Sequence, residues 1–279
     1  MKYSYDSLVY YGESVTDGIA RVAKFGYDAI ELVGEPAQYN VKEVGELCRK
    51  HGVEVSSICS IFFGDERDLV SVDPANRRKA VQYVKDVVDL AAGVGAAMVI
   101  VRPAPFGKIS PGAAAESEWE WAVAGIQESA DYAQSKNVRL CIEAWNRYET
   151  YFANRLDECL ELMRAVNRPN VGVMGDTFHM AIEEESIAEA YRRAGKDLFH
   201  VHFADSNRAA PGRGHTDFKP IVQALKDIGY QGYISFELLP AAADVFGTLK
   251  SGGGKEFFDD YTRLAIDTIK RVEAEVAAV

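Results

Sequence analysis

The strongest constraint on the fold of this chain is a strict alternation of strand-like and helix-like segments from end to end. Short, mostly apolar runs are typical of parallel strands covered by helices. They predict strands near Lys2–Val9, Ala29–Val33, Val53–Cys59, Ala97–Val101, Arg139–Ile142, Val171–Met174, Leu198–Phe203 and Gly232–Phe236. Apolar residues at helical spacing lie between these runs. They predict helices over Val15–Phe25, Val41–His51, Pro74–Gly93, Glu118–Lys136, Arg155–Val166, Ser186–Ala194, Phe218–Ile228 and Phe257–Ala278.

The number of these units indicates how the sheet is arranged. Strict strand–helix alternation implies a parallel sheet. Eight units within 279 residues favour a closed (β/α)8 barrel, the TIM barrel, over an open doubly wound sheet. A dinucleotide-binding sheet would need a glycine fingerprint after the first strand, and the sequence has none there. No linker or shift in composition divides the chain, so we expect a single α/β barrel domain over residues 1–279.

Charge and cysteine content narrow the classes of partner. The formal net charge of −11 argues against nucleic acid and anionic membrane as partners, because both repel an acidic surface. The four cysteines form no CxxC pair and have apolar neighbours, which indicates buried thiols rather than disulfides or a zinc ribbon. The sequence shows neither a signal peptide nor an apolar run of membrane-spanning length, so we expect a cytoplasmic protein.

Acidic or imidazole side chains occur at the ends of four consecutive predicted strands. Glu143 and Glu237 each follow an apolar run, Asp176 ends the sixth strand, and His202 lies near the end of the seventh. In a TIM barrel, chemistry is located where the strands end on the carboxyl-terminal face. This mixture of oxygen and nitrogen ligands suits Mn²⁺, Mg²⁺ or Co²⁺, whereas a structural zinc site favours Cys and His. A single acid here could equally be a helix cap, but four together predict a metal site.

Other polar residues lie close to the same rim. His200 shares a strand face with His202 but lies farther from the strand end, so we interpret it as a hydrogen-bonded histidine of the barrel interior. His179 and Arg208 lie in the predicted loops after strands six and seven, where they could contact a substrate. Glu149, in the loop after strand five, fits a substrate contact or a solvated loop acid.

Several spaced motifs together resemble one enzyme family. The segments Ile142–Glu149 and Asp176–Glu184, then His202, Ser206–Arg208 and Pro211–Gly214, and finally Glu237–Leu238 are similar to those of the D-tagatose and D-psicose 3-epimerases. That family belongs to the xylose-isomerase-like barrels. The resemblance spans Arg139 to Pro240 with its spacing preserved, whereas the first half of the chain matches poorly.

The resemblance implies a function and a set of roles. It implies a ketose 3-epimerase whose divalent metal, Mn²⁺ before Mg²⁺ or Co²⁺, is held by Glu143, Asp176, His202 and Glu237. It also implies that His179, Arg208 and Glu149 contact a small sugar, and that the chain forms a homo-oligomer. The reaction would remove a proton beside a carbonyl and pass through a cis-enediolate. Glu143 and Glu237 would serve as the acid and base on opposite faces of the sugar.

A second enzymatic function at the same site is also compatible with the sequence. Relatives of these epimerases resemble catalytic subunits that act on 3-keto-glycosides, as C-glycoside deglycosidases with a small partner subunit or as 3-keto-glycoside epimerases. The unusual first half and Trp145 keep this alternative open. A binding protein without catalysis would lack a ligand or a base. An endonuclease with three zinc ions would need more than the five histidines present, and a basic groove.

Overall fold

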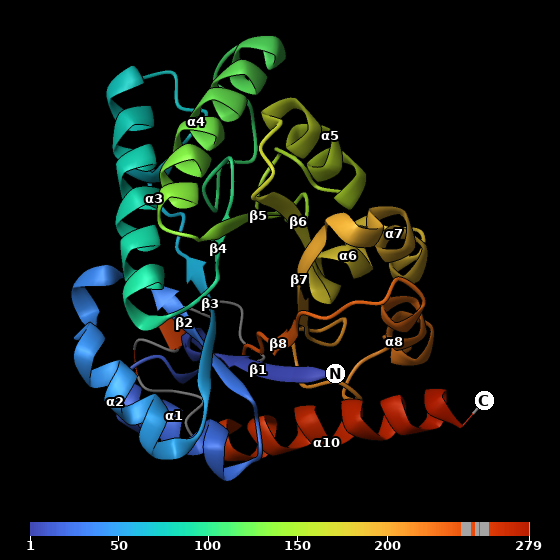
Figure 1. Ribbon diagram of the computed structural model, residues 1–279. Helices are drawn as coiled ribbons and strands as arrows, with labels where there is room; N and C mark the ends of the chain where they lie inside the picture. Colours follow the sequence, from blue (N-terminus) through green and yellow to red (C-terminus); the bar gives the residue numbers. More distant parts are fainter. Residues whose placement is uncertain (241–246, 249–250, 252–256, 279) are drawn as a thin grey trace.

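A computed structural model describes residues 1–240, 247–248, 251 and 257–278. Its centre is a closed barrel in which each strand pairs in parallel with the next, and β1 pairs with β8 (Figure 1). The TIM-barrel prediction is therefore confirmed. The strands are β1 Lys2–Asp6, β2 Ala29–Gly34, β3 Glu54–Ser60, β4 Met98–Val101, β5 Arg139–Glu143, β6 Val171–Asp176, β7 Leu198–Phe203 and β8 Tyr233–Phe236.

The helices form an outer ring around the barrel, and α10 runs beside the first strand (Figure 1). The α-helices are α1 Val15–Lys24, α2 Val41–His51, α3 Pro74–Val94, α4 Ala115–Ser135, α5 Leu156–Val166, α6 Thr177–Glu183, α7 Ile187–Ala194, α8 Phe218–Asp227 and α10 Phe258–Ala277. The described part of the chain also contains four short 3-10 helices, η1 Ser7–Tyr10, η2 Pro36–Gln38, η3 Asp65–Arg67 and η4 Gly195–Asp197.

Two of the differences from the sequence-based prediction concern segments next to the strand ends. The first strand was expected to reach Val9 but ends at Asp6, because the Asp6 side chain accepts the N–H of Leu8 and starts η1. The segment after β6 was expected to be a loop but forms α6. Asp176 caps this helix by accepting the N–H of Phe178 at 2.8 Å, which satisfies a backbone donor at the helix start.

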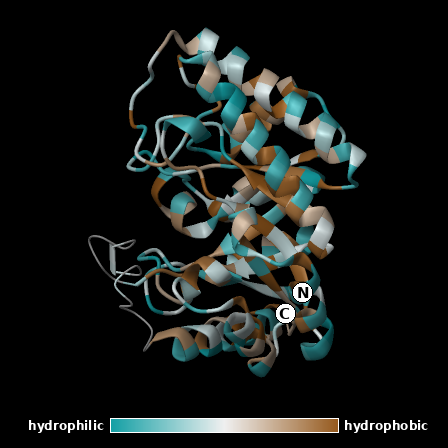
Figure 2. Cartoon of the chain, turned by 90° about the vertical axis from the view of Figure 1, so that its left-hand side faces the viewer, coloured by the Kyte–Doolittle hydropathy of each residue, from teal (hydrophilic) through white to brown (hydrophobic). Residues whose placement is uncertain are grey.

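Apolar side chains fill two regions. The larger core lies between strands and helices and includes Val99 and Val101 of β4. A smaller cluster of Cys59, Met98, Ile100, Cys141 and Met174 occupies the alternate positions, which face the barrel interior. Figure 2 accordingly shows apolar strands inside helices whose faces alternate between hydrophobic and hydrophilic. This packing holds the strand ends in a fixed relation to one another.

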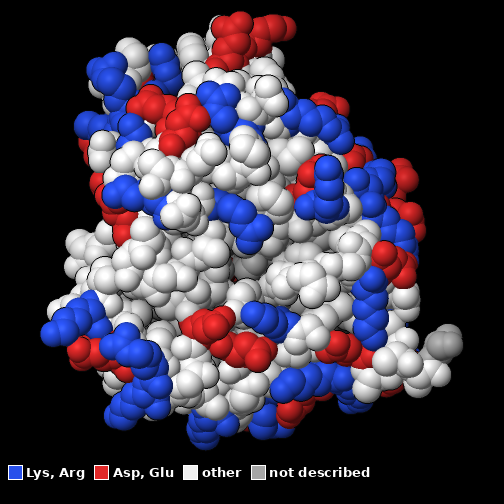
Figure 3. All heavy atoms as spheres, in the orientation of Figure 1, with Lys and Arg blue, Asp and Glu red and all other residues white. Residues whose placement is uncertain are grey.

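Charged side chains of both signs are interspersed on the face drawn in Figure 3. Many are paired between neighbouring helices, as in the ion pairs Arg192–Asp227 at 2.8 Å and Arg193–Asp157 at 3.0 Å. Exposed pairs of this kind each contribute at most about 1 kcal/mol. Within the described residues, no helix has both the length and the apolar character needed to cross a membrane. All four cysteines are free and buried, as predicted.

Candidate metal centre

Four side chains meet at the carboxyl-terminal ends of β5 to β8, as the sequence predicted. Glu143 ends β5, Asp176 ends β6, His202 lies on β7, and Glu237 follows β8. One potential ligand atom from each lies within 4.8 Å of the other three, and all four residues are buried. A buried cluster of two Glu, one Asp and one His suggests a divalent metal, because this donor set suits a hard cation.

The charge state of Glu143 fits such a centre. Burial raises the pKa of its carboxyl to about 7, although Arg102 and His202 lower it. Among the described residues, neither oxygen of Glu143 accepts a well-formed hydrogen bond, and the carboxylate forms an ion pair with Arg102. Buried polar atoms are usually satisfied, so these two oxygens are suited to bind a cation.

Arg208 contacts two of the predicted ligands. One guanidinium nitrogen lies 2.6 Å from Asp176 Oδ2 and another lies 2.6 Å from Glu237 Oε2. Burial alone would raise the pKa of Glu237, but Arg208 and then His202 outweigh it and lower the pKa below its usual range. Arg208 was predicted to contact a substrate. In this structure it neutralises two buried carboxylates, and its role toward a substrate stays a prediction.

His179 lies on α6 rather than in a loop, so that part of the prediction was wrong. Its Nδ1 lies 2.7 Å from the side-chain nitrogen of Asn146. If this amide nitrogen donates, the imidazole proton resides on Nε2, which has no hydrogen-bond partner and lies 3.8 Å from Asp176 Oδ2. Burial, then the charge of Arg208, keeps the pKa of His179 well below its usual value. A neutral imidazole therefore presents an N–H donor beside the cluster.

Glu149 lies near the same cluster and is partly buried. Its Oε1 accepts a hydrogen bond from the Asn146 amide at 3.0 Å, and burial raises its pKa. The alternative of a freely solvated loop acid therefore does not describe this residue. Asn146 joins Glu149 to His179 and holds two of the predicted substrate contacts together.

Several buried groups outside the predicted set of metal ligands and substrate contacts complete the site. Arg102, which follows β4, pairs with Glu143 and stacks 4.3 Å from the ring centre of Trp145. Asp6, at the end of β1, lies near Glu237 and Cys59. Glu31 on β2 contacts His200 and His202. Glu31 and Asp6 could have been singled out in the sequence as charged residues at inward positions of apolar strands. That pattern does not reveal which side chains they contact.

These features define an α/β barrel with a buried carboxylate–histidine centre at the carboxyl ends of its strands. The model of the family described as "Xylose isomerase-like TIM barrel" matches residues 19–250. The chain therefore belongs to the xylose isomerase-like TIM barrel family.

Two characterised relatives are similar over most of the chain. The D-psicose 3-epimerase of Ruminiclostridium cellulolyticum is 31% identical over 263 residues, which cover 89% of each protein. The L-ribulose 3-epimerase of a Methylomonas species is 34% identical over 85% of this chain and 84% of that protein. The similarity thus extends well beyond Arg139–Pro240, the region to which the motifs alone had confined it.

A solved structure and a more distant relative complete the comparison. The crystal structure of D-psicose 3-epimerase with D-tagatose from Clostridium cellulolyticum superposes with a TM-score of 0.87 at 28% identity. It covers 98% of this chain and 99% of that one. The 3-dehydro-D-guloside 4-epimerase of Escherichia coli is 25% identical over 85% of this chain and 92% of that protein.

Proposed function

We propose that this protein is a divalent-metal-dependent sugar epimerase that acts beside a carbonyl, and that its substrate is a free ketose epimerised at carbon 3. The observation that supports this most strongly is the buried cluster of Glu143, Asp176, His202 and Glu237. It lies in a chain that is 31% and 34% identical to two ketose 3-epimerases.

In this proposal the four residues hold the ion, with Mn²⁺ as the first choice and Mg²⁺ or Co²⁺ as alternatives. Such an ion supplies electrostatic stabilisation of negative charge on the substrate oxygens. The donor set fits, because the Glu143 oxygens lack well-formed hydrogen bonds and His202 directs Nδ1 toward Glu237 at 3.1 Å.

The proton at carbon 3 is moved by the two glutamates. One removes it to form the enediolate, and the other returns a proton to the opposite face. Glu143 and Glu237 suit this division, because they come from β5 and from the end of β8, on either side of Asp176 and His202. His179 would donate its Nε2–H to a substrate oxygen. Arg208 and Glu149 would bind further hydroxyls of the sugar.

Proton exchange in deuterium oxide tests this function directly. The Mn²⁺-loaded protein is incubated with a panel of free ketopentoses and ketohexoses, and the products are followed by NMR. We expect deuterium at carbon 3 together with the carbon 3 epimer. An absence of exchange with every free ketose would overturn the ketose 3-epimerase assignment.

The second candidate is an enzyme of 3-keto-glycosides, supported by the E. coli relative that is 25% identical over 85% of this chain. The same assay with 3-keto-glycosides separates the two. Exchange or epimerisation only with these substrates would move the function to this class. Release of an aglycone, with a small protein that copurifies, would indicate a C-glycoside deglycosidase. The homo-oligomeric state and cytoplasmic location stay predictions, and light scattering tests the first.

A further inference from the structure

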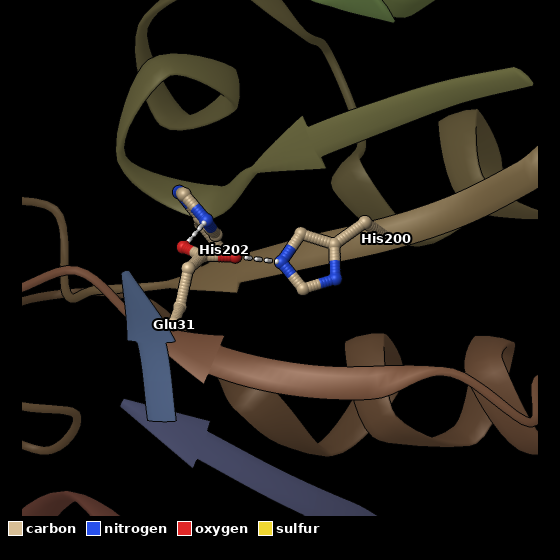
Figure 4. Close-up of side chains that lie close together, drawn as sticks. All are labelled: Glu31, His200 and His202. Carbon is tan, nitrogen blue, oxygen red and sulfur yellow. Dashed lines mark hydrogen bonds and ion pairs between the residues drawn. The ribbon is translucent and has the colours of Figure 1, made fainter. Parts of the chain in front are cut away.

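One buried carboxylate holds two histidines of the barrel interior. Glu31 extends inward from β2, and its carboxylate lies between the imidazoles of His200 and His202 on β7 (Figure 4). Oε1 lies 2.6 Å from His202 Nε2, and Oε2 lies 2.7 Å from His200 Nε2. The Ser57 hydroxyl also donates to Oε2. All three members of this Glu31–histidine group are fully buried.

The contact with Glu31 determines which nitrogen of His202 faces the candidate metal centre. Because Nε2 is engaged by Glu31, the other nitrogen, Nδ1, points toward Glu237 Oε2 at 3.1 Å and Asp176 Oδ2 at 4.0 Å. Rotation of the ring would break the bond to Glu31 and leave a buried carboxylate oxygen unsatisfied, which is costly. The ring is therefore held with one nitrogen directed into the cluster.

Contacts with His200 and Ser57 restrain the Glu31 side chain itself. A carboxylate with a single partner could rotate about its last side-chain bond. Here His200 and Ser57 contact the second oxygen, so both oxygens are held from different strands. His200 and Ser57 thus hold the Glu31 carboxylate in place behind the ring of His202.

We propose that Glu31, clamped by His200 and Ser57, is a positioning residue that directs Nδ1 of His202 to the metal and strengthens metal binding. This inference rests on the proposed metal centre. It gives a defined task to His200, whose Nε2 lies 2.7 Å from Glu31 Oε2. A charged hydrogen-bond acceptor behind a metal-binding imidazole both orients the ring and increases its donor strength.

Replacement of Glu31 by Gln is the sharpest test of this positioning role. Glutamine has the same size but offers one oxygen acceptor and one NH2 donor, so it can accept an N–H from only one of the two histidines. We expect the Kd for Mn²⁺, measured by calorimetry on the metal-free protein, to rise about 10–100-fold. The matched control is Glu54→Gln on the neighbouring strand β3, where the glutamate is exposed and bonds Tyr233; its Kd should equal that of the wild type.

A second test of the positioning role uses no Glu31 variant. It determines by NMR which ring nitrogen of His202 carries the proton. In the Mg²⁺-loaded wild type with ¹⁵N-labelled histidine, we expect His202 and His200 each to retain a low-field Nε2–H. The His200→Gln variant assigns the second signal. Loss of the Nε2–H of His202 on metal binding would overturn the proposal. This measurement decides the question even if Glu31→Gln does not fold.

The outcomes separate this inference from the proposed function. If the wild type binds no divalent ion, the metal centre itself is wrong and the positioning role falls with it. If the wild type binds and Glu31→Gln binds with the same Kd, only the positioning role is overturned. Glu31, His200 and His202 also have the composition of a ligand set. A stoichiometry of two ions lost together in Glu31→Gln would make Glu31 a ligand and overturn its positioning role.

Discussion

At the scale of single residues, the site is organised by the balance of buried charges. Glu143 is compensated by Arg102, whereas Asp176 and Glu237 share Arg208. Arg102 is buried and Arg208 is partly buried among these acids. Removal of one partner from a buried ion pair leaves an uncompensated charge and destabilises a protein by about 3–5 kcal/mol. Amide variants of these acids keep the side-chain shape and disturb packing least, but they leave the partner arginine uncompensated and should also lower stability.

Glu143→Gln and Glu237→Gln test the proposed acid and base. Each variant keeps the side-chain volume but cannot accept the substrate proton. We expect kcat to fall about 10²–10⁴-fold in each, the usual contribution of a general acid or base. Circular dichroism melts should show that the fold is retained. Wild-type turnover in both variants would contradict the assignment.

The pH dependence of metal binding follows from the raised pKa of Glu143. This pKa is about 7 in the metal-free protein. A metal ligand must be deprotonated, so below pH 7 an ion competes with a proton for this carboxylate. We expect the Mn²⁺ affinity to fall by about tenfold or more for each pH unit below 7, because His202, whose pKa is raised by Glu31 and Glu237 against the effect of burial, must also lose a proton. Calorimetry between pH 6 and 8 measures this, and a flat profile would show that Glu143 is no ligand.

At the scale of elements, the loop between β7 and α8 depends on one carboxylate. Asp205 accepts the backbone N–H groups of Ser206 and Gly212 at 2.8 Å and of Thr216 at 3.0 Å. Burial alone would raise the pKa of Asp205, but these backbone donors outweigh it and lower the pKa. The same loop carries Arg208 in a left-handed conformation with φ of 66°. Asp205 thus helps to position the arginine that reaches the cluster.

Asp205→Asn should destabilise the protein in a pH-dependent way. Loss of charged hydrogen bonds should lower the free energy of unfolding at pH 7 by about 1–3 kcal/mol. Because the folded pKa is depressed, the stabilisation by Asp205 is present above the unfolded pKa and is lost as the pH falls through the folded pKa. The difference in the free energy of unfolding between wild type and variant should therefore become smaller at acidic pH. Urea unfolding from pH 7 to 3 measures it, and a gap independent of pH would argue against this account.

At the scale of the whole molecule, the candidate site is assembled by closure of the barrel. Its four predicted ligands come from β5 to β8, whereas Asp6 and Glu31 come from β1 and β2. The N-terminal amine pairs with Glu273 of α10 at 2.9 Å, which ties the two ends of the described chain together. A bound ion would therefore stabilise the native barrel against unfolding as a unit.

Metal removal should lower the melting temperature. An ion at 100 times its Kd adds about 2.7 kcal/mol to the free energy of unfolding. For a chain of this size, that corresponds to roughly 5–10 °C. Calorimetric scans with Mn²⁺ and with a chelator measure the shift. The Glu143→Gln variant should show a much smaller shift, and an equal shift in this variant would place the ion elsewhere.

The sequence by itself determined the barrel and the identity of the clustered residues. Helical and strand periods repeat along the chain, so the eight-unit pattern was readable without long-range contacts. Its position nearer the strand end also placed His202 rather than His200 at the rim, and in the structure His202 joins the cluster. Strand-end acids were identifiable because carboxyl ends of parallel strands meet on one face.

Only the tertiary structure decided how those residues are supported. Glu31 contacts histidines 169 and 171 positions away, and Arg208 bridges Asp176 and Glu237. Such contacts depend on the register between strands, which includes an irregularity between Val173 and Met174. They also depend on barrel closure, which leaves only β1 and β8 between β2 and β7. A period in the sequence records which side of a strand faces inward. It contains no information on which distant side chain occupies the opposite wall, because that is set by packing of the whole barrel.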